Sequence, residues 1–441
     1  MFLDRKFFSN VSKLAGATII AEAIGIITVP IYTRLFSPDV VGQFALLTSA
    51  IGLCGVFSTG RYELAVVLPK QDSEARSIIR GTILWSVIWS LLLTLLIYVF
   101  KGNIVEIGEY YKIVDYLYFI PLFVFLEACI KLFRYWCNRK QQFGLNAGLV
   151  ITNSVVWKGG NILLGFWGFV DAITLIMVRL ASQVVEIIAR FINYFKLVAR
   201  EKIRTNKAEV KIQLRNYKRF PLIDVWNGLL DQGSILIVPI LLSVFFSTTE
   251  VGLYSQSMQI VQLPLAFVSG AFGQVFFQKF AQEENSKAAQ MISESFVLLL
   301  SISVPIFTVL GLFGKSLFSF VLGSRWAMSG LYAQVLAPWC CLRLVWSPLS
   351  VYFEASQRQH IFLIITALTI VTRVISIVLG GLLENCFLAI VFFGISGVVV
   401  NLIGLLLLFK HSGTRMSDIK IAFFELWSRL KSRIHFGSSK Q

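Results

Sequence analysis

The sequence predicts an all-α polytopic membrane protein with about twelve transmembrane helices, arranged as two six-helix bundles related by a pseudo-twofold axis along the membrane normal. Its 441 residues are 56% hydrophobic and only 15% charged, which leaves too little polar surface to cover a soluble globule of that size. Apolar stretches of about 20 residues, each long enough to cross roughly 30 Å of hydrocarbon, recur along nearly the whole chain. Barrel strands would instead give alternating segments of about ten residues.

The predicted spans follow these apolar stretches in chain order. The first stretch follows a short basic region, as a secretory signal would, but it contains Glu22 and Pro30 and lacks a small-residue cleavage site. We therefore expect a retained first helix. The expected helices are 11–33, 43–60, 78–100, 116–137, 146–168, 172–195, 222–246, 253–277, 291–314, 330–350, 361–383 and 387–409.

The distribution of basic residues predicts the orientation of these spans. Of the 40 Lys and Arg, 29 lie at or beside the two ends and the connections on the same side as the ends, whereas the opposite connections carry five. Basic residues concentrate on the cytoplasmic side of membrane proteins, so both termini are expected in the cytoplasm. The expected organisation is a bundle 1–195, a basic linker 196–220, a bundle 221–410 and a basic amphipathic tail 411–441.

The linker and the tail are both candidates for contact with the membrane surface. The linker mixes nine basic residues with Glu201 and Glu209, which fits a helix on the anionic inner leaflet. The tail places aromatic residues among Lys and Arg, which fits either an interfacial helix or a solvated, partly disordered segment. The formal charge of +16 is explained by these loops, so membrane lipids and not nucleic acid are the expected partners.

The chain also repeats itself. The segments VPI at 29–31, FS at 36–37 and VGQF at 41–44 recur as VPI at 238–240, FS at 246–247 and VGLY at 251–254. The loop residues are displaced by 210 positions and the prolines by 209. Because an even number of helices separates the copies, they have the same orientation, as in transporters built from parallel repeats. Chance similarity between apolar segments is the alternative.

Charged residues lie inside several predicted spans, where each costs about 2.5–3.5 kcal/mol unless it faces a cavity or a partner. Arg179, Gln183, Glu186 and Arg190 share one helical face, and Glu127, Lys131 and Arg134 share another. The embedded cations outnumber the embedded acids, so the interior is expected to attract an anion. Alternatively, the pairs Glu127–Lys131 and Glu186–Arg190 merely neutralise each other, and Lys131, Arg134 and Arg190 snorkel to lipid phosphates.

Metal and cofactor chemistry finds no support in the sequence. The three histidines are scattered, and the six cysteines lie in or beside apolar segments without ligand spacing. We therefore expect no metal site and no cofactor.

Two segments near the N-terminus resemble a known family. Residues 33–42, TRLFSPDVVG, and residues 60–70, GRYELAVVLPK, are similar to the opening of the oligosaccharide flippase family, the Wzx-type polysaccharide translocases. That family belongs to the multidrug/oligosaccharidyl-lipid/polysaccharide exporter superfamily. The resemblance implies a non-enzymatic transporter that flips an undecaprenyl-pyrophosphate-linked repeat unit of O-antigen, capsule or exopolysaccharide by alternating access, coupled to a proton or sodium gradient. It also implies a polysaccharide polymerase and a chain-length regulator as partners.

The family offers no universal ligand motif, so the candidate site residues come from the charge pattern. The cations expected to bind the anionic group are Lys131, Lys158, Arg179, Arg343 and Arg373. The candidates for ion coupling are Glu22, Glu127, Glu186 and Asp231. The residues expected at the cytoplasmic mouth are Arg61, Glu63, Arg134 and Arg190.

Two other functions share this general design. An O-antigen polymerase or ligase needs catalytic groups on a sizeable external loop, whereas the external connections expected here have about 15 residues at most. A small-molecule exporter of the multidrug type would favour acidic sites for cationic drugs, and the surplus of embedded cations argues against it.

Overall fold

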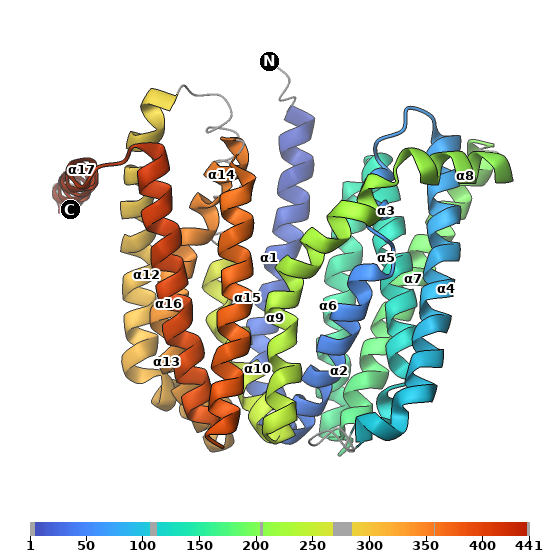
Figure 1. Ribbon diagram of the computed structural model, residues 1–441, viewed down its shortest axis with the longest axis horizontal. Coiled ribbons are helices and arrows are strands. Elements are labelled where there is room, and N and C mark those ends of the chain that lie inside the picture. The colour runs from blue at the N-terminus through green and yellow to red at the C-terminus, as the bar shows by residue number, and fades with distance from the viewer. Residues whose placement is uncertain (1–4, 106–112, 203–205, 268–284, 357, 439–441) are drawn as a thin grey trace. The chain divides into compact units, whose positions relative to one another are not determined.

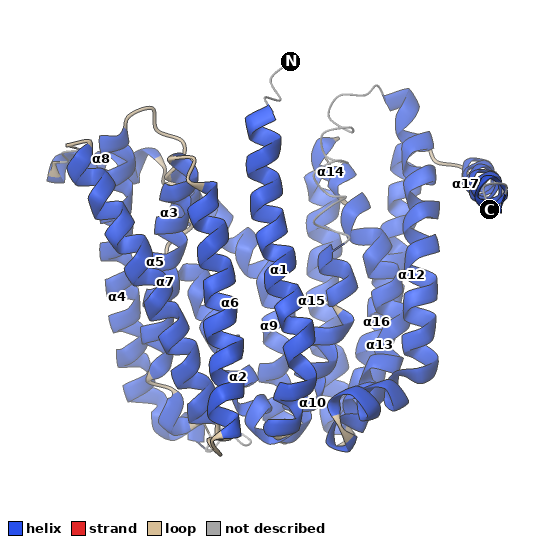
Figure 2. Ribbon diagram, turned by 180° about the vertical axis from the view of Figure 1, so that it is seen from behind, coloured by secondary structure: helices blue, strands red, loops and turns tan. Residues whose placement is uncertain are grey.

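A computed structural model describes the chain apart from residues 1–4, 106–112, 203–205, 268–284, 357 and 439–441. Throughout the described part, every regular element is helical (Figures 1 and 2). The chain separates into two compact units, one of residues 1–255 with 321–326 and the other of residues 256–320 with 327–441.

Unit 1 contains the helices that carry most of the predicted site. Its elements are α1 (Arg5–Leu35), α2 (Pro38–Phe57), α3 (Tyr62–Ala65), α4 (Asp72–Val105), η2 (Val114–Tyr116), α5 (Phe119–Arg139), α6 (Phe143–Phe166), α7 (Ala172–Arg200), α8 (Lys207–Asn216), η3 (Phe220–Asp224), α9 (Val225–Phe245), the start of α10 (Thr248–Val261) and η4 (Ser324–Trp326). One apolar core joins α2, α5 and α7 through Leu47, Phe123 and Ile176. A second joins α4, α5 and α7, around the fully buried Trp136.

Unit 2 is built around α16. Its elements are the end of α10, α12 (Asn285–Leu322) up to residue 320, α13 (Ala327–Leu349), α14 (Val351–Ala355), α15 (Gln359–Leu382), α16 (Cys386–Ser412) and α17 (Met416–Ser438). Helix α16 packs against both α13 and α15. It begins where the Asn385 side chain accepts a hydrogen bond from the Leu388 N–H, and it ends at Gly413, whose φ of 74° suits a residue without a Cβ.

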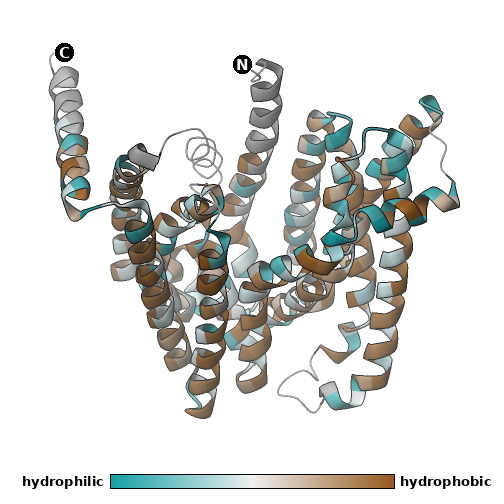
Figure 3. Cartoon of the chain, turned by 45° about the horizontal axis from the view of Figure 1, so that its top comes forward, coloured by the Kyte–Doolittle hydropathy of each residue, from teal (hydrophilic) through white to brown (hydrophobic). Residues whose placement is uncertain are grey.

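The helices confirm a multi-pass membrane protein. In the described part of the chain, seven helices are long and apolar enough to cross a membrane, or eight if the two segments Phe220–Leu230 and Gln232–Phe245, which are bent against each other within α9, count as one span. Figure 3 shows these long helices to be hydrophobic over most of their length. The sequence predicts about twelve spans, and helices cover most of the described part of each predicted segment; residues 268–277 lie outside the described residues. Helices α5 and α6 are not among these seven apolar helices, because they carry polar residues of the predicted site.

The two copies of the sequence repeat pack against each other within unit 1. A Cβ atom added at Gly42 would lie 1.7 Å from the Thr248 carbonyl oxygen, and one added at Gly252 would lie 1.9 Å from the Pro38 carbonyl oxygen. The contact is reciprocal, since Pro38 and Gly42 correspond to Thr248 and Gly252 under the displacement of 210 residues. Only glycine permits helices to approach so closely. The start of α2 thus meets the start of α10 through equivalent residues.

A polar network joins the ends of α4, α5 and α7. Arg139 donates to the Asp72 carboxylate at 2.6 Å and to the Pro69 carbonyl at 2.7 Å. Lys140 contacts the carboxylates of both Asp72 and Glu201. Burial alone would lower the pKa of the Lys140 ammonium, but its hydrogen bonds to the two carboxylates raise that pKa above its ordinary value. The network therefore holds the three helix ends together across the physiological pH range.

Candidate functional site

The polar face of α7, formed by Arg179, Gln183, Glu186 and Arg190, lies inside unit 1. Two of these four residues, Glu186 and Arg190, neutralise each other there. Arg190 is 0% exposed, and its Nε and Nη2 atoms both donate to Glu186 Oε1, at 2.9 and 2.7 Å. Its Nη1 atom donates to the Asn146 side-chain oxygen on α6. Every side of this guanidinium is therefore satisfied, and the alternative that Glu186 and Arg190 neutralise each other describes the pair correctly.

Glu186 connects the same polar face to α5 and α6. Its Oε2 atom accepts a hydrogen bond of 2.9 Å from Asn153 Nδ2, and Arg134 Nη2 lies 3.8 Å from its Oε1 atom. The Asn153 side-chain oxygen in turn accepts a bond of 3.3 Å from Arg179 Nη1. Because the Arg134 side chain is 46% exposed, its contact with Glu186 is weak.

Arg179 stands at the far end of this chain of contacts. Its guanidinium carbon lies 5.7 Å from the centre of the Trp157 ring, within the range of a cation–π interaction. The side chain is half-buried, and in the described part of the chain it makes no ion pair within 4.0 Å. The aromatic face and the Asn153 amide hold the guanidinium in place without cancelling its charge.

Lys158 lies between α1 and α6. Its Nζ atom donates to the Ala21 carbonyl at 2.9 Å, and Ser154 Oγ donates to the same oxygen at 3.1 Å. The lack of a side chain at Gly25 makes room for the ammonium, since a Cβ there would lie 2.4 Å from Nζ. The Glu22 carboxylate interacts electrostatically with the ammonium. The structure thus brings together one predicted cation and one predicted coupling carboxylate.

Glu127 and Lys131 on α5 point to different neighbours. Glu127 Oε1 accepts a hydrogen bond of 3.4 Å from Gln183 on α7, while Lys131 Nζ donates to the Gly55 carbonyl on α2 at 3.4 Å. No Glu127–Lys131 ion pair within 4.0 Å is found among the residues that the structure describes. Both side chains are half-buried. The fourth coupling candidate, Asp231, has a side chain outside the described residues.

Arg61 and Glu63 hold the short helix α3 in position. Arg61 adopts a left-handed conformation with φ 61°, and its Nε atom donates to the Asp224 carbonyl at 3.4 Å. Its guanidinium rests against Gly228, where a Cβ would lie 2.4 Å from Nη2. Glu63 is 4% exposed and accepts a hydrogen bond from Thr59. These contacts give both residues a role in joining α3 to its neighbours.

Unit 2 contains a second cationic cluster, centred on a tryptophan. The guanidinium carbons of Arg343 on α13 and Arg373 on α15 lie 5.2 and 5.3 Å from the centre of the Trp339 ring. Arg373 also lies 5.3 Å from the Phe393 ring centre and is 5% exposed. The sequences of α13, α15 and α16 contain neither Asp nor Glu. Two positive charges therefore share one aromatic ring on helices that supply no carboxylate.

Sequence reasoning missed the residues that orient these cations. They are Asn146, Asn153, Trp157 and Trp339. A signal was available, because Asn146, Asn153 and Trp157 are spaced at i, i+7 and i+11, and Trp339 precedes Arg343 by four residues. Among the residues that the structure describes, no group of three or more His, Cys, Asp or Glu side chains could hold a metal ion.

Comparison with known proteins shows which family the sequence matches. A family model described as polysaccharide biosynthesis protein matches residues 31–330. No curated protein sequence matches the chain significantly. Among solved structures, a lipid II flippase MurJ in an inward closed conformation is similar with a TM-score of 0.75 and 12% identity, covering 93% of this chain and 90% of that one.

Two further structures show the same fold. An inward-facing multidrug resistance MATE family transporter has a TM-score of 0.66 and 15% identity, covering 88% of this chain and 94% of its own. A MOP superfamily transporter from Pyrococcus furiosus has a TM-score of 0.58 and 13% identity, with coverages of 92% and 95%. At such low identity the likeness shows the fold alone, and the chain shares the fold of these three structures.

Proposed function

The chain belongs to the polysaccharide biosynthesis protein family, and from that premise we propose that it is a flippase for an anionic lipid-linked oligosaccharide. The cargo would be an undecaprenyl-pyrophosphate-linked repeat unit of a surface polysaccharide such as O-antigen. The protein would move this unit across the bacterial cytoplasmic membrane by alternating access, coupled to an ion gradient. It would act as a transporter and not as an enzyme.

The observation that carries this proposal is the pair of arginines on Trp339. Arg343 and Arg373 place two guanidinium groups beside one tryptophan ring within hydrophobic helices. Guanidinium groups bind pyrophosphate oxygens in bidentate geometry and remain charged when buried. Cationic drugs would be repelled by the same charges, so the cluster favours an anion over the cargo of a multidrug exporter.

Each candidate residue has a part in the proposed cycle. A pyrophosphate and the saccharide attached to it cannot cross hydrocarbon, while the polyprenyl tail can stay in lipid, so the protein needs to shelter only the polar head of the cargo. In unit 2, Arg343 and Arg373 would bind the pyrophosphate. In unit 1, the candidate cations are Arg179, Lys131 and Lys158. Glu22 is the coupling candidate that interacts with one of these cations, Lys158. Glu186 is a weaker coupling candidate, because Arg190 already neutralises it.

The finer architecture is part of the same proposal. We infer twelve spans in two parallel six-helix repeats, 1–195 and 221–410, with the linker 196–220, the tail 411–441 and both termini in the cytoplasm. The reciprocal contact between Gly42 and Gly252 supports the repeat. Partners would include a polymerase and a chain-length regulator that use the flipped unit.

Charge reversal tests the assignment. We expect Arg343→Glu to lower surface polysaccharide at least about tenfold, since truncating one side of a buried charge pair costs roughly 2–5 kcal/mol. Arg343→Lys, which keeps the charge but loses the planar group, should retain part of the activity. Lys315→Glu, an exposed cation on α12, is the matched control and should display normal polysaccharide.

Two measurements accompany these variants. Membrane immunoblots establish that each variant is present in equal amount, and purified protein in liposomes reports movement of a lipid-linked saccharide between leaflets. Normal glycan display by both Arg343→Glu and Arg373→Glu would remove the cluster from the site. Formation of new glycosidic bonds by the purified protein would refute transport as its sole activity.

A further inference from the structure

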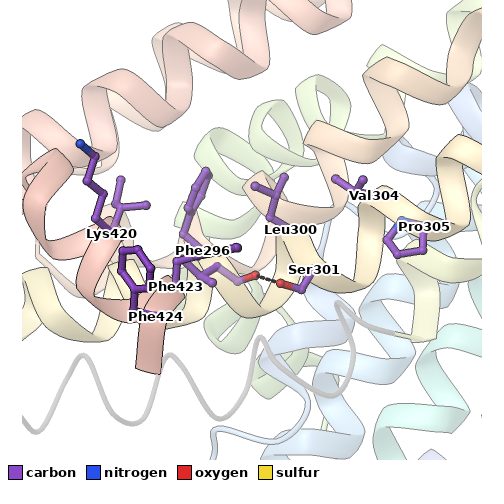
Figure 4. Close-up of a pocket in the computed structure, with 10 residues that line it drawn as sticks. Phe296, Leu300, Ser301, Val304, Pro305, Lys420, Phe423 and Phe424 are labelled. Atoms are coloured by element: carbon purple, nitrogen blue, oxygen red, sulfur yellow. Dashed lines mark hydrogen bonds between the residues drawn. The ribbon is translucent and has the colours of Figure 1, made fainter. Parts of the chain in front are cut away.

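The helix α17 forms a groove with α12 in unit 2. Thr414, two residues before α17, donates a hydrogen bond of 3.5 Å from its Oγ1 atom to the Ala289 carbonyl of α12, and Ala422 of α17 is 6% exposed. Beside this contact lies a cavity of about 660 Å³. Figure 4 shows it bordered by Leu300, Val304 and Pro305 of α12 and by the rings of Phe423 and Phe424 of α17.

The groove offers almost no polar groups to a ligand. Ser301 lines it, but the Ser301 hydroxyl donates to the Val297 carbonyl of its own helix at 2.7 Å. Lys420 is the one ionisable residue among those that line the groove, and its side chain is exposed. In Figure 4 Lys420 and Pro305 lie at opposite ends of the row of labelled side chains. The groove is therefore an apolar channel with a cation at one end.

The apolar lining with one cation at its end indicates what kind of molecule the groove can bind. A peptide segment would bring backbone N–H and C=O groups that the groove cannot satisfy, and each such group costs several kcal/mol in hydrocarbon surroundings. A hydrocarbon chain brings none. A cation at the end of the groove favours a negatively charged head group on that chain.

The surrounding charges favour the same ligand. Residues 410–441 contain seven Lys and Arg against Asp418 and Glu425. Both of these acids line a separate cavity, together with Glu294, and not the apolar groove. The acidic side of α17 is thus segregated from the side that carries Lys420.

We propose that the groove between α12 and α17 binds one anionic membrane phospholipid, with an acyl chain along Leu300 and Val304 and the phosphate at Lys420. The site is separate from the arginine cluster of the proposed transport function and does not depend on it. The phospholipid would fasten α17 to the membrane surface. The position of α17 would then respond to the anionic lipid content of the membrane.

Native mass spectrometry of the purified full-length protein tests this site, with phosphatidylglycerol and phosphatidylcholine of identical acyl chains as probes. Val304→Trp places an indole in the groove at a position that is 45% exposed, and Val309→Trp is the matched control on the same helix, 51% exposed and outside the groove. We expect Val304→Trp to weaken phosphatidylglycerol binding at least tenfold, since excluding only two methylene groups has about that effect. The control should bind as the unaltered protein does.

The charge variants test the head group. Lys420→Glu should reduce the preference for phosphatidylglycerol over phosphatidylcholine about fivefold or more, as expected for a basic residue at an anionic surface. Arg415→Glu makes the same charge change on the same exposed tail but outside the groove, and should leave the preference intact. Equal phosphatidylglycerol binding by the two tryptophan variants would overturn the groove as the site. An unchanged preference in Lys420→Glu would overturn the phosphate contact.

Discussion

At the scale of single residues, the buried pair of Glu186 and Arg190 makes the sharpest stability prediction. Glu186→Gln would leave the Arg190 guanidinium charged and fully buried without its carboxylate, a change that costs about 3–5 kcal/mol. We expect a lower apparent melting temperature in detergent, measured by fluorescence-detected size exclusion. Glu127→Gln is the control, because that carboxylate is half-buried and makes only a 3.4 Å bond to Gln183. If the double variant Glu186→Gln/Arg190→Gln is as unstable as Glu186→Gln alone, the cost does not come from the stranded charge.

The same pair shows how far sequence reasoning reaches at this scale. Helical spacing places Glu186 and Arg190 four residues apart on one face, so their pairing could be predicted as an alternative. Spacing along a helix does not fix the register between helices. The bonds from Arg190 to Asn146 and from Asn153 to Glu186 depend on how α6 packs on α7, and so does the contact of Arg179 with Trp157. The charged residues were predictable, whereas the polar and aromatic residues that orient them were not found.

At the scale of elements, the two repeat-related glycines allow the start of α2 to approach the start of α10 closely. Gly42→Ala would put a methyl group 1.7 Å from the Thr248 carbonyl oxygen, so the two helix starts would have to move apart. We expect a loss of about 1–3 kcal/mol, typical of overpacking, and a matching loss for Gly252→Ala. Gly148→Ala is the control, since a Cβ at this α6 position meets nothing within 4 Å. Thermal unfolding of the three variants in one detergent would measure the difference, and equal stability of all three would contradict the close contact.

Element boundaries were predictable where composition and capping agree. The expected helix 387–409 corresponds to α16, Cys386–Ser412, because Asn385 and Gly413 bound a mostly apolar run. The expected helix 78–100 is shorter than α4, Asp72–Val105, since the polar first turns of α4 lie outside its apolar stretch. The sequence fits two alternatives for the tail, an interfacial helix or a disordered segment. The structure contains the helix α17, because Ala422 and Thr414 contact the rest of unit 2, and such contacts cannot be inferred from amphipathicity alone.

At the scale of the whole molecule, the proposed even number of spans and the bias of basic residues make one joint prediction about sidedness. The six native cysteines are buried or half-buried, so they should give a low background with a membrane-impermeant maleimide. Ser417→Cys in the tail and Asp171→Cys between α6 and α7 each introduce an exposed thiol. We expect Asp171→Cys to be labelled in intact cells and Ser417→Cys only after permeabilisation, because 29 of 40 Lys and Arg lie on the side of the ends. The reverse pattern would invert the orientation. Labelling of both thiols in intact cells would require an even number of spans between residues 171 and 417, in place of the seven that we propose.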